Sequence, residues 1–301
     1  MQVDSLTLQL LPEFLIAGVL IGVVYALMAL GISFIFNVMR MINWAMGEFY
    51  MIGSFVQYFL VASFLGPNLW WLALPITAGS VFLLGCLVQR VLLSPMYARG
   101  FEQAEEYATV MTIALMLLLR SLATALSGPY TLTPPSNLGN FNIGPLSVSG
   151  AQAAAGIGGL LATGLFILFL NRTWWGLAFR AAAQNRVGAA TSGVNLGRID
   201  MIGFGIGVGM AAVAGGLLAP VYLVYPTNGL VTTTKGFEII IIGGLGSLSG
   251  AVVGGLILGL VESLGALFFA AEYKDVYGFL AVIVILLLRP NGLFGERARE
   301  G

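Results

Sequence analysis

The sequence predicts an all-α polytopic membrane protein, and three features predict it: many apolar residues, few charges, and apolar runs long enough to cross a bilayer. Hydrophobic residues make up 58% of the 301 residues and charged residues 9%, with a mean hydropathy of +0.96. An average soluble domain is about one-quarter charged. Thirteen basic and thirteen acidic residues are too few to cover a soluble protein of this size. The solvent around most of the chain is therefore expected to be lipid.

The charged and reactive residues exclude several classes of function. The formal net charge is zero, so no basic field attracts nucleic acid, and nucleic-acid binding is not expected. Cys86 is the only cysteine and there is no histidine, which excludes an internal disulfide and His-based acid–base chemistry. We therefore expect no catalytic residues, no metal site and no cofactor bound by this chain.

Apolar runs give the expected spans, because a membrane helix needs about 20 predominantly apolar residues. Eight such runs predict about eight transmembrane helices in a single domain over residues 1–301. They lie at 12–36, 43–65, 69–93, 107–127, 147–170, 199–225, 249–270 and 275–289. A ninth stretch, 237–245, is too short to cross and ends among glycines. It predicts a half-helix that breaks inside the membrane, where protein or a cavity must surround its backbone.

Arginines predict the orientation, because Lys and Arg accumulate in cytoplasmic loops. Ten arginines follow the first, third, fifth and last spans: Arg40, Arg90, Arg99, Arg172, Arg180, Arg186, Arg198, Arg289, Arg297 and Arg299. The opposite connections hold only Lys235 and Lys274. If the half-helix and its glycine loop return the chain to the inner side, the N-terminus lies outside and the C-terminus in the cytoplasm. The first residues contain Asp4 and no basic residue, so no cleavable signal is expected.

Two kinds of internal pattern are visible. Residues 21–32 and 206–217 are identical at six of twelve positions, which favours an inverted repeat of the kind found in transporters, although shared Ala and Gly also explain it by chance. Glycines recur every four residues in Gly246, Gly250 and Gly254. This spacing predicts a helix face on which another backbone packs closely.

Several polar residues are candidates for function. Asn43 and Glu48 stand at the start of the second span, where they either cap the helix and interact with its dipole or take part in gating. Tyr25 and Glu238 are further candidates for the pathway. Arg120 and Glu262 lie within apolar spans, where they either pair with each other or reach toward an interface.

The connection after the fifth span, about 171–198, is more than a turn. Residues 179–190 are rich in Ala, with Arg180 and Asn185 among them, which predicts a short surface helix ended by Gly193. Such a helix either docks into a groove on a soluble partner or only anchors the chain by its positive charge.

These motifs resemble the membrane permeases of bacterial ATP-binding-cassette (ABC) importers for branched-chain amino acids, a group with relatives for urea and short amides. The likeness rests on 22–31 with Tyr25, on INWAMGEFYMIGS at 42–54, on RAAAQNRVGAATSGVNLGRI at 180–199 and on FEIIIIGGLGSLSGAVVGGLILGLVE at 237–262. It spans nearly the whole chain. Met46 stands where the family often has His, which leaves the role of that position in doubt.

The resemblance implies a machine in the bacterial cytoplasmic membrane with several partners. These are two ABC ATPase subunits that carry ATP and Mg²⁺, a second permease that is commonly a paralogue, and a periplasmic or lipid-anchored substrate-binding protein. Arg180, Ala181, Asn185, Ala189 and Gly193 would contact the ATPase, although the usual Glu-Ala-Ala motif is absent. The residue before Lys235 is Thr234 rather than Gly, so no Walker A motif is present. The alternative functions are a secondary transporter that uses intramembrane carboxylates, and an ABC permease for urea or short amides.

Overall fold

The computed structural model describes residues 5–95, 104–143 and 146–295, and these residues form a helical bundle. Arg99, Arg297 and Arg299, which support the predicted orientation, lie outside them. Seven helical segments in the described part are long and apolar enough to cross a membrane, which confirms the predicted class of all-α polytopic membrane protein. They are Gln9–Met39, Met46–Leu65, Pro67–Leu93, Glu105–Ser127, Gly150–Arg172, Leu196–Leu218 and Leu248–Phe268.

The α-helices correspond to the predicted spans with shifted ends. They are α1 (Ser5–Met39), α2 (Met46–Leu60), α3 (Trp70–Val88), α5 (Ala104–Ser127), α6 (Gly150–Arg172), α7 (Trp174–Gln184), α8 (Arg186–Thr191), α9 (Leu196–Leu218), α10 (Asn228–Gly243), α11 (Leu248–Phe268) and α12 (Lys274–Leu288). The last of these has 15 residues, fewer than a straight crossing needs.

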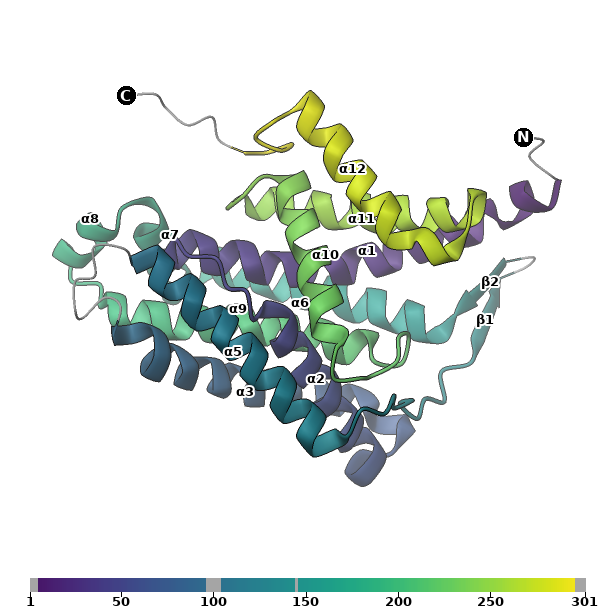
Figure 1. Ribbon diagram of the computed structural model, residues 1–301, viewed down its shortest axis with the longest axis horizontal. Coiled ribbons are helices and arrows are strands. Elements are labelled where there is room, and N and C mark those ends of the chain that lie inside the picture. Colours follow the sequence, from purple (N-terminus) through teal and green to yellow (C-terminus); the bar gives the residue numbers. More distant parts are fainter. Residues whose placement is uncertain (1–4, 96–103, 144–145, 296–301) are drawn as a thin grey trace.

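Helices α1 and α9 form the centre of the bundle. Helix α1 packs on α6, α9 and α11, and α9 also packs on α2 and α3. In Figure 1 these two helices run along the long axis, while α10 crosses them and α12 lies on the outside. Most of the spanning part of α9 is buried, whereas α5 is largely exposed. An exposed apolar helix such as α5 is expected where lipid or another subunit surrounds the bundle.

Glycines let α1 and α11 approach each other. A Cβ atom on Gly22 would lie 3.0 Å from the Gly255 carbonyl oxygen, and one on Gly18 would lie 3.0 Å from the Gly259 carbonyl oxygen. The contact is reciprocal, because side chains at Gly255 and Gly259 would meet the backbone of α1. The backbones are therefore in direct contact, as small residues at membrane helix interfaces permit.

The predicted half-helix is present as α10, but it is longer than expected. It begins at Asn228 and not at 237. The preceding helix, α9, ends at Leu218, earlier than the predicted 225. Helix α10 ends at Gly243, where Gly244 adopts a left-handed φ of +100°. The amides of Leu293 and Phe294 each donate at 2.9 Å to carbonyls in the last two residues of α10. The C-terminal segment thus satisfies backbone groups that a helix broken at membrane depth would otherwise leave unpaired.

A β-hairpin and a buried loop are two features that the sequence did not predict. The hairpin pairs β1 (Asn140–Ile143) with β2 (Leu146–Ser149) in antiparallel fashion, so α6 begins at Gly150 instead of 147. Between α1 and α2, residues 40–45 are not helical, and most of them are buried or half-buried. Non-helical backbone is tolerated at this position because protein surrounds it.

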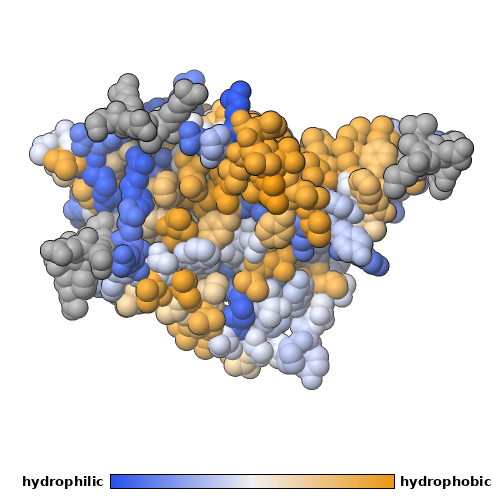
Figure 2. Space-filling model, turned by 45° about the horizontal axis from the view of Figure 1, so that its top comes forward, coloured by the Kyte–Doolittle hydropathy of each residue, from blue (hydrophilic) through white to orange (hydrophobic). Residues whose placement is uncertain are grey.

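The two ends of the bundle differ in polarity. Helices α7 and α8 lie at the end where α1 and α6 finish and α9 begins, and the hairpin lies at the opposite end (Figure 1). Hydrophilic residues gather near the α7–α8 end, and a broad apolar surface covers the middle of the molecule (Figure 2). Five arginines belong to this end: Arg172 ends α6, Arg180 and Arg186 lie on α7 and α8, Arg198 lies in the first turn of α9, and Arg40 bonds to α7. We call this end the basic end.

Candidate functional site

A cavity of about 450 Å³ lies among α1, α9, α10 and α11. Its apolar wall includes Val24, Met28, Leu218, Val221 and Val231. Exposed residues Leu223 and Ala271 also line it, so it opens at the end of the bundle opposite the basic end. A mostly apolar cavity of this volume with a few polar groups is typical of a small-molecule site.

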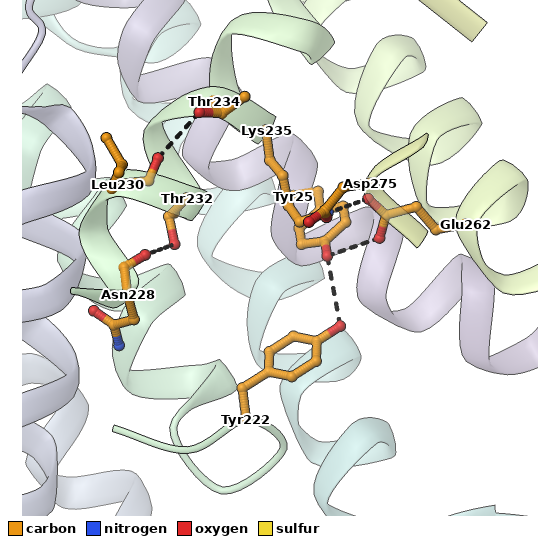
Figure 3. A network of polar contacts seen from close by, with 9 residues as sticks. All are labelled: Tyr25, Tyr222, Asn228, Leu230, Thr232, Thr234, Lys235, Glu262 and Asp275. Carbon is orange, nitrogen blue, oxygen red and sulfur yellow. Dashed lines mark hydrogen bonds and ion pairs between the residues drawn. The ribbon is translucent and has the colours of Figure 1, made fainter. Parts of the chain in front are cut away.

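A polar network forms one side of this cavity (Figure 3). Lys235 of α10 forms ion pairs with Glu262 of α11 and with Asp275 of α12, the latter at 2.8 Å between Nζ and Oδ1. The Tyr25 hydroxyl donates to Glu262 Oε2 at 3.0 Å and lies 3.5 Å from the Tyr222 hydroxyl. The Lys235 ammonium is also 5.8 Å from the centre of the Tyr25 ring, within range of a cation–π interaction.

An aromatic cluster lies on α1 between the level of Tyr25 and the basic end. Phe34 follows Tyr25 by nine residues along α1, and its ring contacts the rings of Phe166 and Phe179 edge-on at 5.1 Å. The Phe34 and Phe179 side chains are almost completely buried. These rings pack α1 against α6 and α7, and none of the three lines the cavity.

Among the predicted pathway residues, Tyr25 lines the cavity and the other three do not. Asn43 accepts a hydrogen bond from the Ala45 amide at 3.0 Å and does not cap α2, whose N-cap is Ala45. Glu48 lies in the first turn of α2, as expected, but it also pairs with Arg120 of α5 at 2.9 Å. The Glu48 side chain has no exposed surface, so this partner compensates a buried charge.

The proposed pairing of Arg120 with Glu262 is wrong. Arg120 bonds to Glu48, whereas Glu262 bonds to Lys235 and Tyr25. Helix α5 carries Arg120 on the side facing α2, while Glu262 lies across the bundle on α11. The sequence identified both residues as intramembrane charges, but it did not show which helices are neighbours.

Glu238 is buried in α10 beside Gly278 of α12, and its Oε2 atom has no hydrogen-bond partner among the described residues. The glycine gives this carboxyl group its space, because a Cβ atom at 278 would almost touch it.

The glycines chosen for helix packing take two roles. Gly250 and Gly254 lie on α11 directly against the backbone of α10, at Gly243 and Ile239 respectively. Gly246 lies before α11 in a turn with φ +80°, where its carbonyl accepts a hydrogen bond from Asn37. Gly246 thus acts in the chain reversal after the half-helix and not on the helix face.

The connection at 171–198 is helical but broken. Asn185 separates α7 from α8 and caps α8, because its Oδ1 accepts from the Gly188 amide at 2.9 Å. Gly193 follows α8 with a left-handed φ of +87°, as expected for a residue that ends a helix. Arg180 and Asn185 are exposed, Ala181 is half-buried, and Ala189 is buried in the core.

Two arginines tie this connection to the bundle. Arg186 of α8 bonds to both carboxylate oxygens of Asp200 on α9, at 2.7 and 3.0 Å, and also donates to the Val38 carbonyl at the end of α1. Arg40 donates to the Ala183 carbonyl on α7 at 3.0 Å. Helices α7 and α8 are therefore fastened to the ends of both central helices.

Sequence reasoning placed Lys235 in an external connection and did not select Asp275 or Tyr222. One signal was available for Lys235, because a carboxylate within a span needs a cation and the chain has only two lysines. No cluster of three metal-ligating side chains occurs in the described ranges.

Comparison with known proteins gives matches over most of the chain. The family model described as branched-chain amino acid transport system / permease component matches residues 14–288. The high-affinity branched-chain amino acid transport system permease protein LivH of Escherichia coli (strain K12) is 33% identical, over 93% of this chain and 94% of that protein. The corresponding protein BraD of Pseudomonas aeruginosa is 32% identical, over 94% of this chain and 95% of that protein. A probable LivH of Methanocaldococcus jannaschii is 28% identical, over 89% and 88%. No solved structure gives a significant match.

Proposed function

Because this chain belongs to the family of branched-chain amino acid transport system permease components, we propose that it is the membrane-spanning subunit of an ATP-driven importer for branched-chain or similarly small amino acids. The observation that carries this proposal is the cavity between α1, α9, α10 and α11. Its apolar wall suits an aliphatic side chain, and its charged side suits the head group of an amino acid.

The basic end faces the cytoplasm in this proposal. Arg40, Arg172 and Arg198 stand at the ends of spans there, in agreement with the positive-inside rule. The N-terminal end of α1 is then outside and the end of α12 inside. The cavity opens to the outer side. This is the arrangement that would receive a substrate from an external binding protein.

The α7–α8 connection is the proposed contact with the ATPases. Arg180 and Asn185 are exposed there, as a docking residue must be, whereas the buried Ala189 would support the helix from inside. ATP and Mg²⁺ are bound by the two ATPase subunits. A second permease and a substrate-binding protein complete the assembly.

The transmission route depends on Arg186. Movement of α8 would move this arginine, and with it Asp200 on α9 and the end of α1. Both helices line the cavity further along. Alternating access then results from displacement of α1 and α9 relative to their neighbours.

Reconstitution tests this proposal. The chain is co-expressed with candidate ATPases, a second permease and a binding protein, purified in mild detergent, and inserted into liposomes. Uptake of radiolabelled leucine that requires ATP and the binding protein is expected. Uptake driven by an ion gradient with this chain alone would overturn the proposal in favour of a secondary transporter. Arg180→Glu is expected to reduce co-purification of the ATPase, and full retention would contradict the assigned docking site.

A further inference from the structure

Charges from three helices meet at the wall of the cavity. Lys235 on α10 lies between Glu262 on α11 and Asp275 on α12 (Figure 3). The side chains of Lys235 and Glu262 are 13% and 5% exposed, and that of Asp275 is 64% exposed. The cluster is thus buried on one side and reachable from the cavity mouth on the other.

The composition of the cluster suits a particular kind of ligand. It contains two carboxylates and one ammonium, so it carries surplus negative charge beside the one buried cation. Buried charges must stay paired, because an unpaired charge in a low-dielectric site is strongly unfavourable. An incoming group that breaks the Lys235–Glu262 pair must therefore supply a replacement for each partner. A zwitterion supplies both, and a neutral amide supplies neither.

Resting on the proposed function, we propose that Lys235, Glu262 and Asp275 form a recognition site for the zwitterionic head group of a transported α-amino acid. The substrate carboxylate binds the Lys235 ammonium, and the substrate ammonium binds the carboxylates of Glu262 and Asp275. No charge is left without a partner during this exchange. The aliphatic side chain lies against the apolar wall that includes Met28 and Val231.

The site would select for substrate class within the permease itself. Urea and short amides lack both charges, so they have nothing to offer in place of the Lys235–Glu262 pair. The two tyrosines contribute in a different way. Tyr25 holds Glu262 through its hydroxyl, and Tyr222 lies next to Tyr25, so both keep the carboxylate in position. They are positioning residues in this scheme.

Binding would also change the contacts among three helices. The ion pairs of Lys235 hold α10 against α11 and α12. When substrate takes over these charges, the direct bridges are replaced by bridges through the ligand. Substrate occupancy and the packing of the half-helix are therefore linked at this one cluster.

A protection assay tests the site directly, without relying on selection by a binding protein. Thr232 lines the cavity without joining the ion cluster, so Thr232→Cys is introduced in a Cys86→Ala background. The rate of modification by a small water-soluble thiol reagent is measured on the assembled transporter in proteoliposomes. Leucine is expected to slow the reaction, and isovaleramide, which has a similar side chain but no charge, is expected not to.

The variant series is designed to separate recognition from structure. Lys235→Met is expected to abolish leucine protection and to reduce leucine uptake about tenfold or more, because hydrogen bonds to charged groups are lost. Arg90→Met and Glu106→Gln, changes to exposed residues that do not line the cavity, are the controls and should behave as the parent does. The triple variant Lys235→Met/Glu262→Gln/Asp275→Asn removes all three charges of the cluster together, so none of the three is left without its partner. If the ion pairs only hold the helices together, the triple variant should still transport leucine. If they bind the substrate, leucine uptake and leucine protection should both stay lost.

The outcomes are distinct. If the parent transports leucine and the triple variant transports it equally well, the recognition site is wrong and the proposed function stands. Equal protection by leucine and isovaleramide, or protection by neither, also overturns the site. If the parent complex does not transport leucine at all, the proposed function fails first. Leucine uptake with protection that is lost in both Lys235→Met and the triple variant supports both.

Discussion

The ion pair between Glu48 and Arg120 gives a specific prediction about stability, because its two side chains are buried to different extents. The Glu48 side chain is completely buried, and that of Arg120 is 23% exposed. Arg120→Met leaves a buried carboxylate without its cation, and removing one partner of a buried pair costs about 3–5 kcal/mol. Glu48→Gln leaves the less buried Arg120 guanidinium, whose long side chain can extend toward the membrane interface, so it should cost less.

The double variant Glu48→Gln/Arg120→Met removes both charges and should recover most of the loss, since neutral replacements of a buried pair are often tolerated. Stability is measured by reversible denaturation in mixed detergent micelles, with helix content as the signal. Arg90→Met, a change to an exposed arginine at the end of α3, is the control. Parent-like stability of Arg120→Met would refute the reasoning, as would a double variant no more stable than Arg120→Met.

The same variants decide the role of Glu48. Both interpretations, a structural charge at the start of α2 and a gating group, predict a buried carboxylate. They differ in the transport activity expected once fold and charge balance are restored. If the stable double variant still imports leucine, Glu48 is structural. If it folds but does not transport, Glu48 has a second role in gating.

Three further predictions concern packing, capping and orientation. Gly255→Val should separate α1 from α11 and destabilise the bundle by about 1–3 kcal/mol through overpacking. The control Gly79→Val, where the structure has open space, should cost little. Equal effects of the two variants in the same denaturation assay would contradict the close packing. Asn195→Ala removes the side-chain cap of α9, which accepts from the Arg198 amide at 3.1 Å, and should cost about 1 kcal/mol; an unchanged midpoint of denaturation would argue against the cap. Ser192→Cys in a Cys86→Ala background should react with an impermeant maleimide only in inside-out vesicles, and labelling from the outside of intact cells would reverse the proposed orientation.

The sequence was sufficient to predict the class of fold, because composition and the length of apolar runs can be read without knowing which helices are neighbours. Every predicted span contains a helix, and the half-helix was recognisable from its short length and its glycines. Its start was predicted nine residues too late, at 237 instead of 228, because Thr232, Thr233 and Thr234 resemble a polar loop. In the structure, each of these hydroxyls donates to a carbonyl four residues earlier, which satisfies it within the helix.

The contacts that form the candidate site were beyond the reach of sequence reasoning. Tyr25 and Glu262 are 237 residues apart, and Lys235 and Asp275 are 40 apart. Their meeting depends on which helices are neighbours, and apolar periodicity carries little information about neighbours when lipid and protein are equally apolar surroundings. For the same reason the sequence could not decide whether Arg120 and Glu262 pair with each other, which they do not.

The cavity and the α7–α8 connection are joined by two uninterrupted helices. Tyr25 lies at the cavity and Val38 at the Arg186 contact, thirteen residues apart on α1, which corresponds to about 20 Å along a helix. On α9, Leu218 lines the cavity and Asp200 bonds to Arg186. Because a helix transmits displacement along its axis with little compression, a shift at Arg186 is expected to reach the cavity without a chain of side-chain rearrangements between them. Asp200→Asn weakens only the α9 branch of this connection, so it should uncouple ATP hydrolysis from leucine uptake in part while leaving the Val38 branch on α1 intact. An Asp200→Asn transporter with the parent ratio of leucine imported to ATP hydrolysed would show that α9 does not carry the movement.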